Sequence, residues 1–250
     1  MTDTPVLQAK GLNKTFGAVV AAANIDVDVA TGERLSLIGA NGAGKTTFVN
    51  MVTGYLTPDT GEILLDGQPI TRKNPRQITQ MGVCRSFQIP QLCEGMTPRQ
   101  NLMIAVGASR PNFSFFKPVG AEGADAQVAE LLERFDIGAY ADRPVSELPG
   151  GVRKLLDIAM ALVRHPKVLL LDEPTSGVSS EEKFGLMDTV MAAVSSEPVT
   201  VLFVEHDMDI VTRYADRILA FYAGEIIADD RPDEVLSDIR VQRYVTGTAK

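Results

Sequence analysis

Residues 39–47, which read GANGAGKTT, have the types and spacing that bind the phosphates of a nucleoside triphosphate. They match the pattern G-x-x-x-x-G-K-[ST], whose glycines allow successive backbone N–H groups to point toward one anion. The lysine adds a positive charge for the β- and γ-phosphates, and the following threonine offers a hydroxyl to Mg²⁺. The residues expected to contact the nucleotide are Gly39, Ala40, Asn41, Gly42, Ala43, Gly44, Lys45, Thr46 and Thr47, with Thr46 also on the metal.

Two carboxylates follow an apolar strand in the second half of the chain. Asp172 and Glu173 come directly after Val168–Leu171, a continuous apolar run typical of a parallel strand buried on both faces. A carboxylate that leaves such a strand near a phosphate loop can hold Mg²⁺ through water, and this is the role expected of Asp172. Glu173 can orient or deprotonate the attacking water.

Gln88 and His206 occupy similar positions after two further strands. Gln88 ends the segment 82–88, and His206 follows the apolar run 199–204. Because ligands bind beyond the carboxyl ends of parallel strands, both side chains are expected to face the γ-phosphate. Either residue alone is more often structural, but their presence together with the loop and the two carboxylates favours a role in catalysis.

Apolar periodicity predicts the elements that position these groups. Residues 34–38 are expected to form a strand ahead of the phosphate loop. Helical spacing over 46–53, with Gly54 at the C-terminal cap, places a helix N-terminus at the phosphates. The other expected elements are strands at 6–16, 19–29, 82–88, 168–171 and 199–204, hairpins around Asp66-Gly67 and Gly224, and helices at 97–105, 125–135, 151–164 and from Pro232.

These elements predict an α/β fold with a phosphate-loop NTPase (RecA-like) core, an antiparallel β subdomain and a helical insertion subdomain. We expect residues 1–250 to form one domain. Within it, residues 1–88 and 165–228 are expected to form the core with its β subdomain. Residues 89–164 are expected to form the helical subdomain, and residues 229–250 a C-terminal helical tail.

Composition limits the class of protein and its partners. The 250 residues carry a formal net charge of −8, which argues against a general nucleic-acid-binding surface. Cys84 and Cys93 have neither zinc-ligand spacing nor a disulfide framework, so a reducing compartment is expected. The first residues lack the features of a signal peptide, and no run of about 18 apolar residues indicates a membrane span. Any role at a membrane is therefore expected to be peripheral.

The order of these motifs resembles the nucleotide-binding subunit of an ATP-binding-cassette (ABC) transporter, over nearly the whole chain. In the sequence of several short segments the chain is most similar to the ATPases of branched-chain (hydrophobic) amino-acid importers. The family resemblance rests on the phosphate loop, Gln88, Leu148–Gly151, Val168–Pro174 and Val204–Met208. The subgroup resemblance rests on 85–88, 95–102 and the long segment after it, 204–208, 224–228 and 244–247.

The resemblance implies roles for individual residues. Phe16 falls where the family stacks an aromatic ring on adenine, although the sequence equally allows a core position at a strand end. Gln88 would sense Mg²⁺ and water, ahead of a loop that meets the membrane subunits, and His206 would contact the γ-phosphate. Pro149, Gly150 and Gly151 lie where a helix N-terminus of the family binds the ATP of a second chain.

The resemblance also implies an assembly and a location. Two chains, identical or paralogous, would hold two ATP molecules with Mg²⁺ between them, and hydrolysis would release the dimer. The further partners would be transmembrane permease subunits and, indirectly, a solute-binding protein. The chain would lie peripherally on the cytoplasmic face of the inner membrane, with branched-chain amino acids or related small solutes as cargo and no nucleic-acid partner.

Two segments depart from the family pattern. The family usually has Leu-Ser-Gly-Gly-Gln where this chain has LPGGV at 148–152. Pro149 lacks both the hydroxyl that bonds the γ-phosphate and a backbone donor, and Val152 lacks a side-chain amide. Because one charge-assisted hydrogen bond is worth about 1.5–3 kcal/mol, weaker ATP binding at the partner site is expected. Residues 176–180, SGVSS, also have serine where Asp or Asn is common. Hydrolysis is still expected, since Glu173 and His206 are intact.

Other functions remain alternatives. A non-transport ABC ATPase of DNA repair or translation usually has two cassettes or a long coiled coil, and neither is visible. An ATPase for lipid or lipopolysaccharide export has a similar cassette, but the long segment after Leu102 favours an importer. A kinase or GTPase is disfavoured by Gly150-Gly151, by His206 and by the lack of an N-K-x-D motif. Phe113, Phe115 and Phe116 could dock a membrane subunit or pack beneath their own loop.

Overall fold

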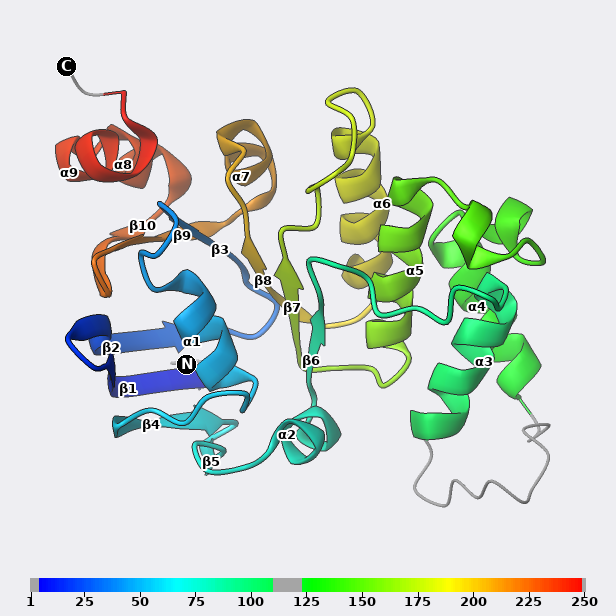
Figure 1. The fold of residues 1–250 in the computed structure, drawn as a ribbon, viewed down its shortest axis with the longest axis horizontal. Helices are drawn as coiled ribbons and strands as arrows, with labels where there is room; N and C mark the ends of the chain where they lie inside the picture. Colours follow the sequence, from blue (N-terminus) through cyan, green and yellow to red (C-terminus); the bar gives the residue numbers. More distant parts are fainter. Residues whose placement is uncertain (1–4, 110–122, 249–250) are drawn as a thin grey trace.

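The computed structural model describes residues 5–109 and 123–248. A four-stranded sheet, a six-stranded sheet and the helices of residues 98–134 follow one another across the molecule (Figure 1). Phe113, Phe115 and Phe116, considered above as a docking surface, lie outside the described residues.

The six-stranded sheet carries the edge at which the predicted functional residues meet. Its strands are β3 (Arg34–Gly39), β6 (Val83–Ser86), β7 (Val168–Asp172), β8 (Thr200–Val204), β9 (Arg217–Tyr222) and β10 (Glu225–Asp230). They lie in the order β10-β9-β3-β8-β7-β6, and all neighbours are parallel except β10 and β9. The carboxyl ends of five strands therefore lie along one edge.

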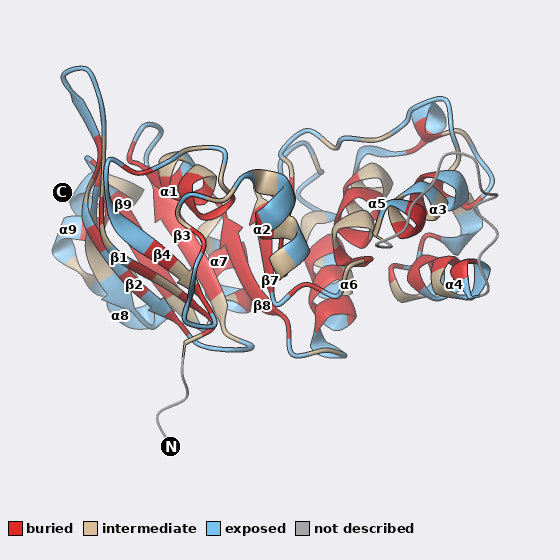
Figure 2. Ribbon diagram, turned by 90° about the horizontal axis from the view of Figure 1, so that it is seen from below, coloured by how far each residue is buried: buried red, intermediate tan, exposed pale blue. Residues whose placement is uncertain are grey.

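Apolar runs form the central strands because both faces of the sheet are covered (Figure 2). Leu169 and Leu171 point into one hydrophobic cluster, whereas Val168 and Leu170 point into the other. The first cluster is formed with α5 (Gly150–Leu162), α6 (Lys183–Ser195) and α7 (Met208–Tyr214). The second is formed with α1 (Lys45–Val52), α2 (Pro75–Met81) and the smaller sheet.

The smaller sheet is antiparallel, as predicted, with the order β2-β1-β4-β5. Its hairpin turn at Asp66 and Gly67 has φ values of 48° and 72°, which suit a tight two-residue turn. Val6 and Val29, at the end of the first hairpin, are joined by a backbone hydrogen bond of 2.9 Å. The strands are β1 (Leu7–Phe16), β2 (Val19–Val29), β4 (Thr60–Leu65) and β5 (Gln68–Pro69).

Between β6 and β7 the described residues form several helices. Thr97 and Gln100 bond each other's backbone N–H reciprocally at 3.3 and 3.0 Å, and thereby cap the first of these helices. That helix is longer than predicted, while α5 ends two residues earlier than predicted. The elements are α3 (Pro98–Ser109), α4 (Ala124–Arg134), η1 (Gly138–Tyr140), η2 (Val145–Glu147) and α5.

After β10, short helices pack near that edge strand and its neighbour β9. Tyr244 stacks on Tyr222 of β9 with ring centroids 4.5 Å apart. These elements are α8 (Pro232–Ser237), α9 (Ile239–Val241) and η3 (Gln242–Thr246). The sequence predicted a helical tail over 229–250 with a helix from Pro232, but not its division into three elements. Among the described residues, no helix combines the length and apolar character that crossing a bilayer requires.

Candidate nucleotide-binding site

The phosphate loop connects β3 to α1, as predicted, and its backbone requires glycine. Gly39 and Gly44 have φ values of 152° and 114°. A Cβ atom on Gly39 would lie 2.5 Å from the carbonyl oxygen of Phe221, and one on Gly44 would lie 2.7 Å from that of Ala21. A cavity of 140 Å³ opens above this loop. It is lined by Asn41, Gly42, Ala43, Gly44, Lys45, Thr46, Thr47, Glu173, Val204 and His206.

Lys45 is held within the loop itself. Its Nζ donates to the carbonyl oxygens of Gly39 at 2.6 Å and Ala40 at 3.1 Å. Burial lowers the pKa of this ammonium group, and the charges of Glu173 and Asp172 act in the opposite direction. The positive charge that the sequence predicted for the phosphates is therefore present at the cavity wall, close to both carboxylates.

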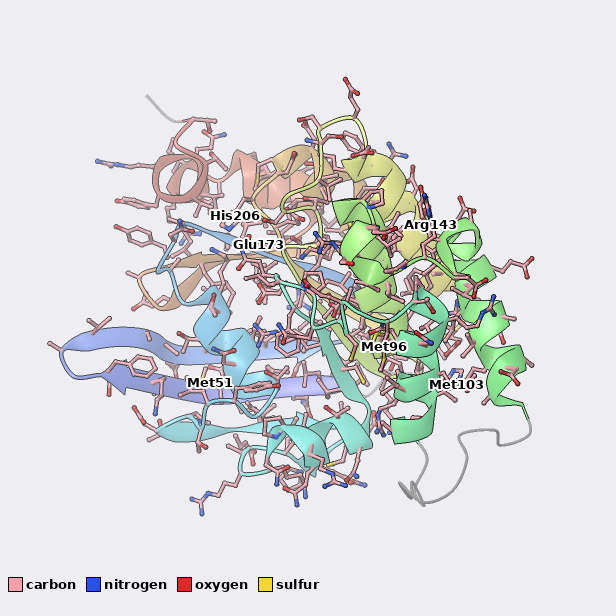
Figure 3. All side chains as sticks on the ribbon, turned by 45° about the vertical axis from the view of Figure 1, so that its right-hand side comes forward. Met51, Met96, Met103, Arg143, Glu173 and His206 are labelled. Atoms are coloured by element: carbon pink, nitrogen blue, oxygen red, sulfur yellow. The ribbon has the colours of Figure 1, made fainter. Side chains whose placement is uncertain are left out.

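Glu173 contacts both Gln88 and His206, the two residues that the sequence predicted to face the γ-phosphate. Gln88 Nε2 donates to its Oε2 at 2.7 Å, and His206 Nε2 lies 3.2 Å from its Oε1 (Figure 3). The backbone of Glu173 has φ 48°, a region that few residues other than glycine adopt, and its N–H donates to Val204 at 3.0 Å. The structure thus gathers three side chains from the ends of β6, β7 and β8.

Gln88 and His206 do not end their strands as the sequence suggested. β6 ends at Ser86 and β8 ends at Val204, so each side chain lies two residues beyond its strand. These extra residues extend the chain toward Glu173, which itself follows β7.

Asp172 is paired with an arginine that the sequence analysis did not single out. Arg85 Nη2 lies 2.5 Å from Asp172 Oδ2, and Arg85 Nη1 donates to Asn50 on α1 at 2.8 Å. The side chains of Arg85 and Asp172 are only 9% and 14% exposed, so the pair is largely shielded from water. Arg85 lies within a segment predicted to be a strand, and a buried arginine requires an anionic partner. That requirement is the signal by which the sequence could have pointed to Arg85.

The oxygen donors near the loop fit Mg²⁺. Thr46, which carries a hydroxyl, lines the cavity, and Asp172 Oδ1 is not used by Arg85. Mg²⁺ binds through few protein oxygens and completes its shell with water and phosphate. No cluster of three or more His, Cys, Asp or Glu side chains suited to a metal occurs in residues 5–109 and 123–248.

Pro149, Gly150 and Gly151 lie at the start of α5 and do not line the phosphate cavity. Pro149 is the N-cap residue, with φ −55° and ψ 150°, and no side chain caps the helix there. None of the three is among the residues that line the cavity above the loop. Gly150 instead borders a second cavity of 250 Å³, which Gln88 and Lys154 also line.

Phe16 lies at the tip of the β1–β2 hairpin and is 52% exposed. Its position excludes the core role that the sequence left open. Lys14 Nζ lies 5.7 Å from the centre of its ring. The ring is not among the residues that line the phosphate cavity.

Glu205 is a buried carboxylate that the sequence analysis missed. It is 3% exposed and accepts hydrogen bonds from the N–H of Thr175 at 3.0 Å and from its hydroxyl at 2.7 Å. These bonds tie the segment after β8 to the segment after β7, and so fix the spacing of His206 and Glu173.

The fold and this arrangement can be compared with known proteins. The family model described as ABC transporter matches residues 22–176 of this chain, more than half of its length. The chain belongs to the ABC transporter family. This confirms the family predicted from the sequence, and the cassette is accordingly an ATPase subunit of that family.

Two curated relatives match almost the whole ABC chain. It is 34% identical to the probable branched-chain amino acid transport ATP-binding protein LivG of Methanocaldococcus jannaschii, over 99% of this chain and 100% of that protein. It is also 34% identical to the high-affinity branched-chain amino acid transport ATP-binding protein LivG of Escherichia coli K12, over 98% and 99% of the two chains.

Solved ABC structures confirm the predicted fold class. The ADP conformation of an ATP-binding cassette of an ABC transporter is 32% identical, with a TM-score of 0.83 over 95% of this chain and 97% of that one. A nucleotide-free ATP-binding cassette is also 32% identical, with a TM-score of 0.82 over 94% and 96%.

Proposed function

We propose that this ABC ATPase hydrolyses ATP to power the import of branched-chain amino acids or related small solutes. The observation that carries the catalytic part is the carboxylate of Glu173, bonded to Gln88 and His206 beside the phosphate loop. The cargo rests on similarity to two proteins named for branched-chain amino acid transport, each 34% identical over nearly the full chain.

The nucleotide phosphates would bind the backbone N–H groups of residues 39–47. On binding, Lys45 would exchange the carbonyl oxygens of Gly39 and Ala40 for β- and γ-phosphate oxygens. Phe16, exposed at the hairpin tip, would stack on the adenine ring.

Glu173 would act on the attacking water. Its carboxylate accepts a hydrogen bond from Gln88 on one oxygen and contacts His206 on the other. Because the lone pairs not used by these contacts can accept a proton from water, Glu173 is the proposed general base. His206 would also contact the γ-phosphate, and Gln88 would respond to the water and the metal.

Thr46, Asp172 and Gln88 would supply the oxygen ligands of Mg²⁺, directly or through water. Bound Mg²⁺ would neutralise charge that develops on the phosphates. Arg85 holds one oxygen of Asp172, which leaves the other oxygen available.

A second ATPase subunit would complete the site. Gly150 and Gly151 begin α5 and do not line the phosphate cavity, so their N–H groups are free to serve the nucleotide of a partner chain. In this proposal residues 89–164 act as the helical subdomain that meets the permease, residues 1–88 and 165–228 as the core, and residues 229–250 as the tail. The dimer would lie peripherally on the cytoplasmic face of the inner membrane, with a solute-binding protein delivering cargo to the permease.

Two measurements test this proposal. The first is ATP hydrolysis by the purified chain, which should occur only with Mg²⁺ present. If the chain hydrolyses no ATP even when it is reconstituted in its transporter, the catalytic part of the proposal is contradicted. Deletion of the gene should abolish ATP-dependent uptake of radiolabelled leucine, isoleucine and valine, and the intact gene should restore it. Unchanged uptake of all three would reject this cargo.

A further inference from the structure

Helix α5 carries two buried charged side chains, and both bond the loop that contains Gln88. Lys154 and Asp157 are 4% and 7% exposed. They are three positions apart, so they share one face of the helix. Neither belongs to a motif assigned above.

Lys154 joins two loops of the proposed catalytic site. Its Nζ donates to the carbonyl oxygen of Gln88 at 2.5 Å and to that of Phe87 at 3.3 Å. It also donates to the backbone carbonyl of Glu173 at 3.3 Å. One ammonium group therefore bonds the main chain of both residues whose side chains meet at 2.7 Å.

The carboxylate of Asp157 accepts hydrogen bonds from backbone N–H groups of the same loop. Its Oδ2 accepts from Phe87 at 3.1 Å, and its Oδ1 accepts from Gln91 at 3.2 Å. The donors flank Gln88, so the backbone on both sides of this residue is tied to α5. Ile89, between them, is 74% exposed.

Packing alone does not require charged side chains at positions 154 and 157. Burying two charged groups costs free energy that an apolar pair of similar volume would avoid. Burial lowers the pKa of Lys154 and raises that of Asp157, while the opposite charge of each partner acts against these changes. Charged groups form strong, directional hydrogen bonds. The hydrogen bonds of Lys154 and Asp157 described above all go to backbone atoms of Glu173 or of the loop that contains Gln88.

We propose that Lys154 and Asp157 are positioning residues that couple the placement of α5 to the alignment of Gln88 and Glu173. The helix begins at Gly150, so a displacement of its N-terminus would move the main chain on both sides of the Gln88–Glu173 contact. This inference rests on the proposed function, in which that N-terminus meets the ATP of a partner chain.

The first test compares Lys154→Met with Arg134→Met in the full chain. Arg134 is a matched control because it also donates to a backbone carbonyl, Ala193, and pairs with a carboxylate, Glu197, away from the site. Lys154→Met should lower kcat for ATP at least about tenfold without weakening ATP binding, because small misplacements of catalytic groups are costly. Lys154→Arg should restore most of the rate. An unchanged kcat in folded Lys154→Met would overturn the proposal, as would an equal loss in Arg134→Met.

Hydrogen exchange provides a second test that needs no substitution. In the wild-type chain, the amides of Phe87 and Gln91 should exchange at least about tenfold more slowly than that of exposed Ile89, since Asp157 protects them. Equal exchange rates at the three amides would overturn the proposal. If the amides are protected but the wild-type chain in its transporter hydrolyses no ATP, the proposed function fails while the contacts of α5 stand.

Discussion

Nε2 of His206 lies 3.2 Å from Oε1 of Glu173, although the two residues are 33 positions apart in the chain. Glu173 follows β7 and His206 follows β8, which are neighbours in the parallel sheet. The contact orients one oxygen of the carboxylate, and Gln88 orients the other at 2.7 Å. The carboxylate is therefore held in one place beside the phosphate loop.

Glu173→Gln should abolish turnover while leaving ATP binding intact. The amide has the same shape but cannot take a proton from water, and loss of a general base typically costs about 10²–10⁴ in rate. Phosphate release and equilibrium ATP binding measure the two effects. Glu130→Gln, an exposed change on α4, is the control. Equal rates for wild type and Glu173→Gln would remove Glu173 from its proposed role.

Lys45→Met should weaken ATP binding at least about tenfold, because a charge-assisted hydrogen bond contributes about 1.5–3 kcal/mol. Lys45 is 5% exposed and faces the loop, whereas Lys167 pairs with Asp66 at the surface. Lys167→Met is therefore expected to bind ATP as wild type does. Titration calorimetry of both variants checks this, and an unchanged affinity in Lys45→Met would exclude a phosphate contact.

Pro149→Ser should strengthen ATP-driven dimerisation about tenfold, because it restores one hydroxyl able to bond a phosphate. Serine is also a good N-cap, whereas Pro149 provides no side-chain cap for α5. Pro144→Ser is a matched control, since Pro144 precedes η2 with a similar backbone conformation and likewise provides no side-chain cap. Sedimentation of both variants in the Glu173→Gln background measures the effect. If Pro149→Ser dimerises no more tightly than its parent, Pro149 does not weaken the partner site.

The two cysteines should react very differently with iodoacetamide. Burial raises the pKa of Cys84 to about 11, while Cys93 is exposed. Because the thiolate is the reactive form, native protein at about pH 8 should be alkylated at Cys93 alone. In guanidinium chloride both should react. Peptide mapping of the native sample decides this, and equal labelling of both thiols would contradict the burial of Cys84.

Much of the nucleotide site could be predicted because its signals are local. The glycines and Lys45 occupy fixed spacings, and Val168–Leu171 is apolar on both faces. Since parallel strands share one carboxyl edge, Gln88 and His206 could be expected near the γ-phosphate, although their contacts with Glu173 were not predicted. The exposure of Phe16 could not be predicted, because an aromatic residue at a strand end suits both a core and a surface position.

Other features depend on contacts between distant segments. Arg85 and Asp172 are 87 positions apart, so no local pattern pairs them. Lys154 and Asp157 lie in a helix that was predicted correctly, but their carbonyl and amide partners belong to other loops. The sequence offered one signal for this pair, which is that Lys154 and Asp157 place two charges three positions apart on a helix that is otherwise largely apolar. Helices α2, α6 and α7 were not predicted. Helices α2 and α7 have only seven residues each, too few for a clear period. Helix α6 has 13 residues and was missed although its buried residues recur at helical spacing.

ATP-driven dimerisation tests the composite site most directly. The Glu173→Gln chain, of 27.0 kDa as wild type, should be monomeric without nucleotide and form a dimer of twice that mass with ATP and Mg²⁺. Light scattering after size-exclusion chromatography measures the mass, with Pro149→Ser added to favour association. We expect a dimer with ATP and a monomer with ADP. A chain that binds ATP yet stays monomeric in both variants would contradict a site shared between two copies of this chain.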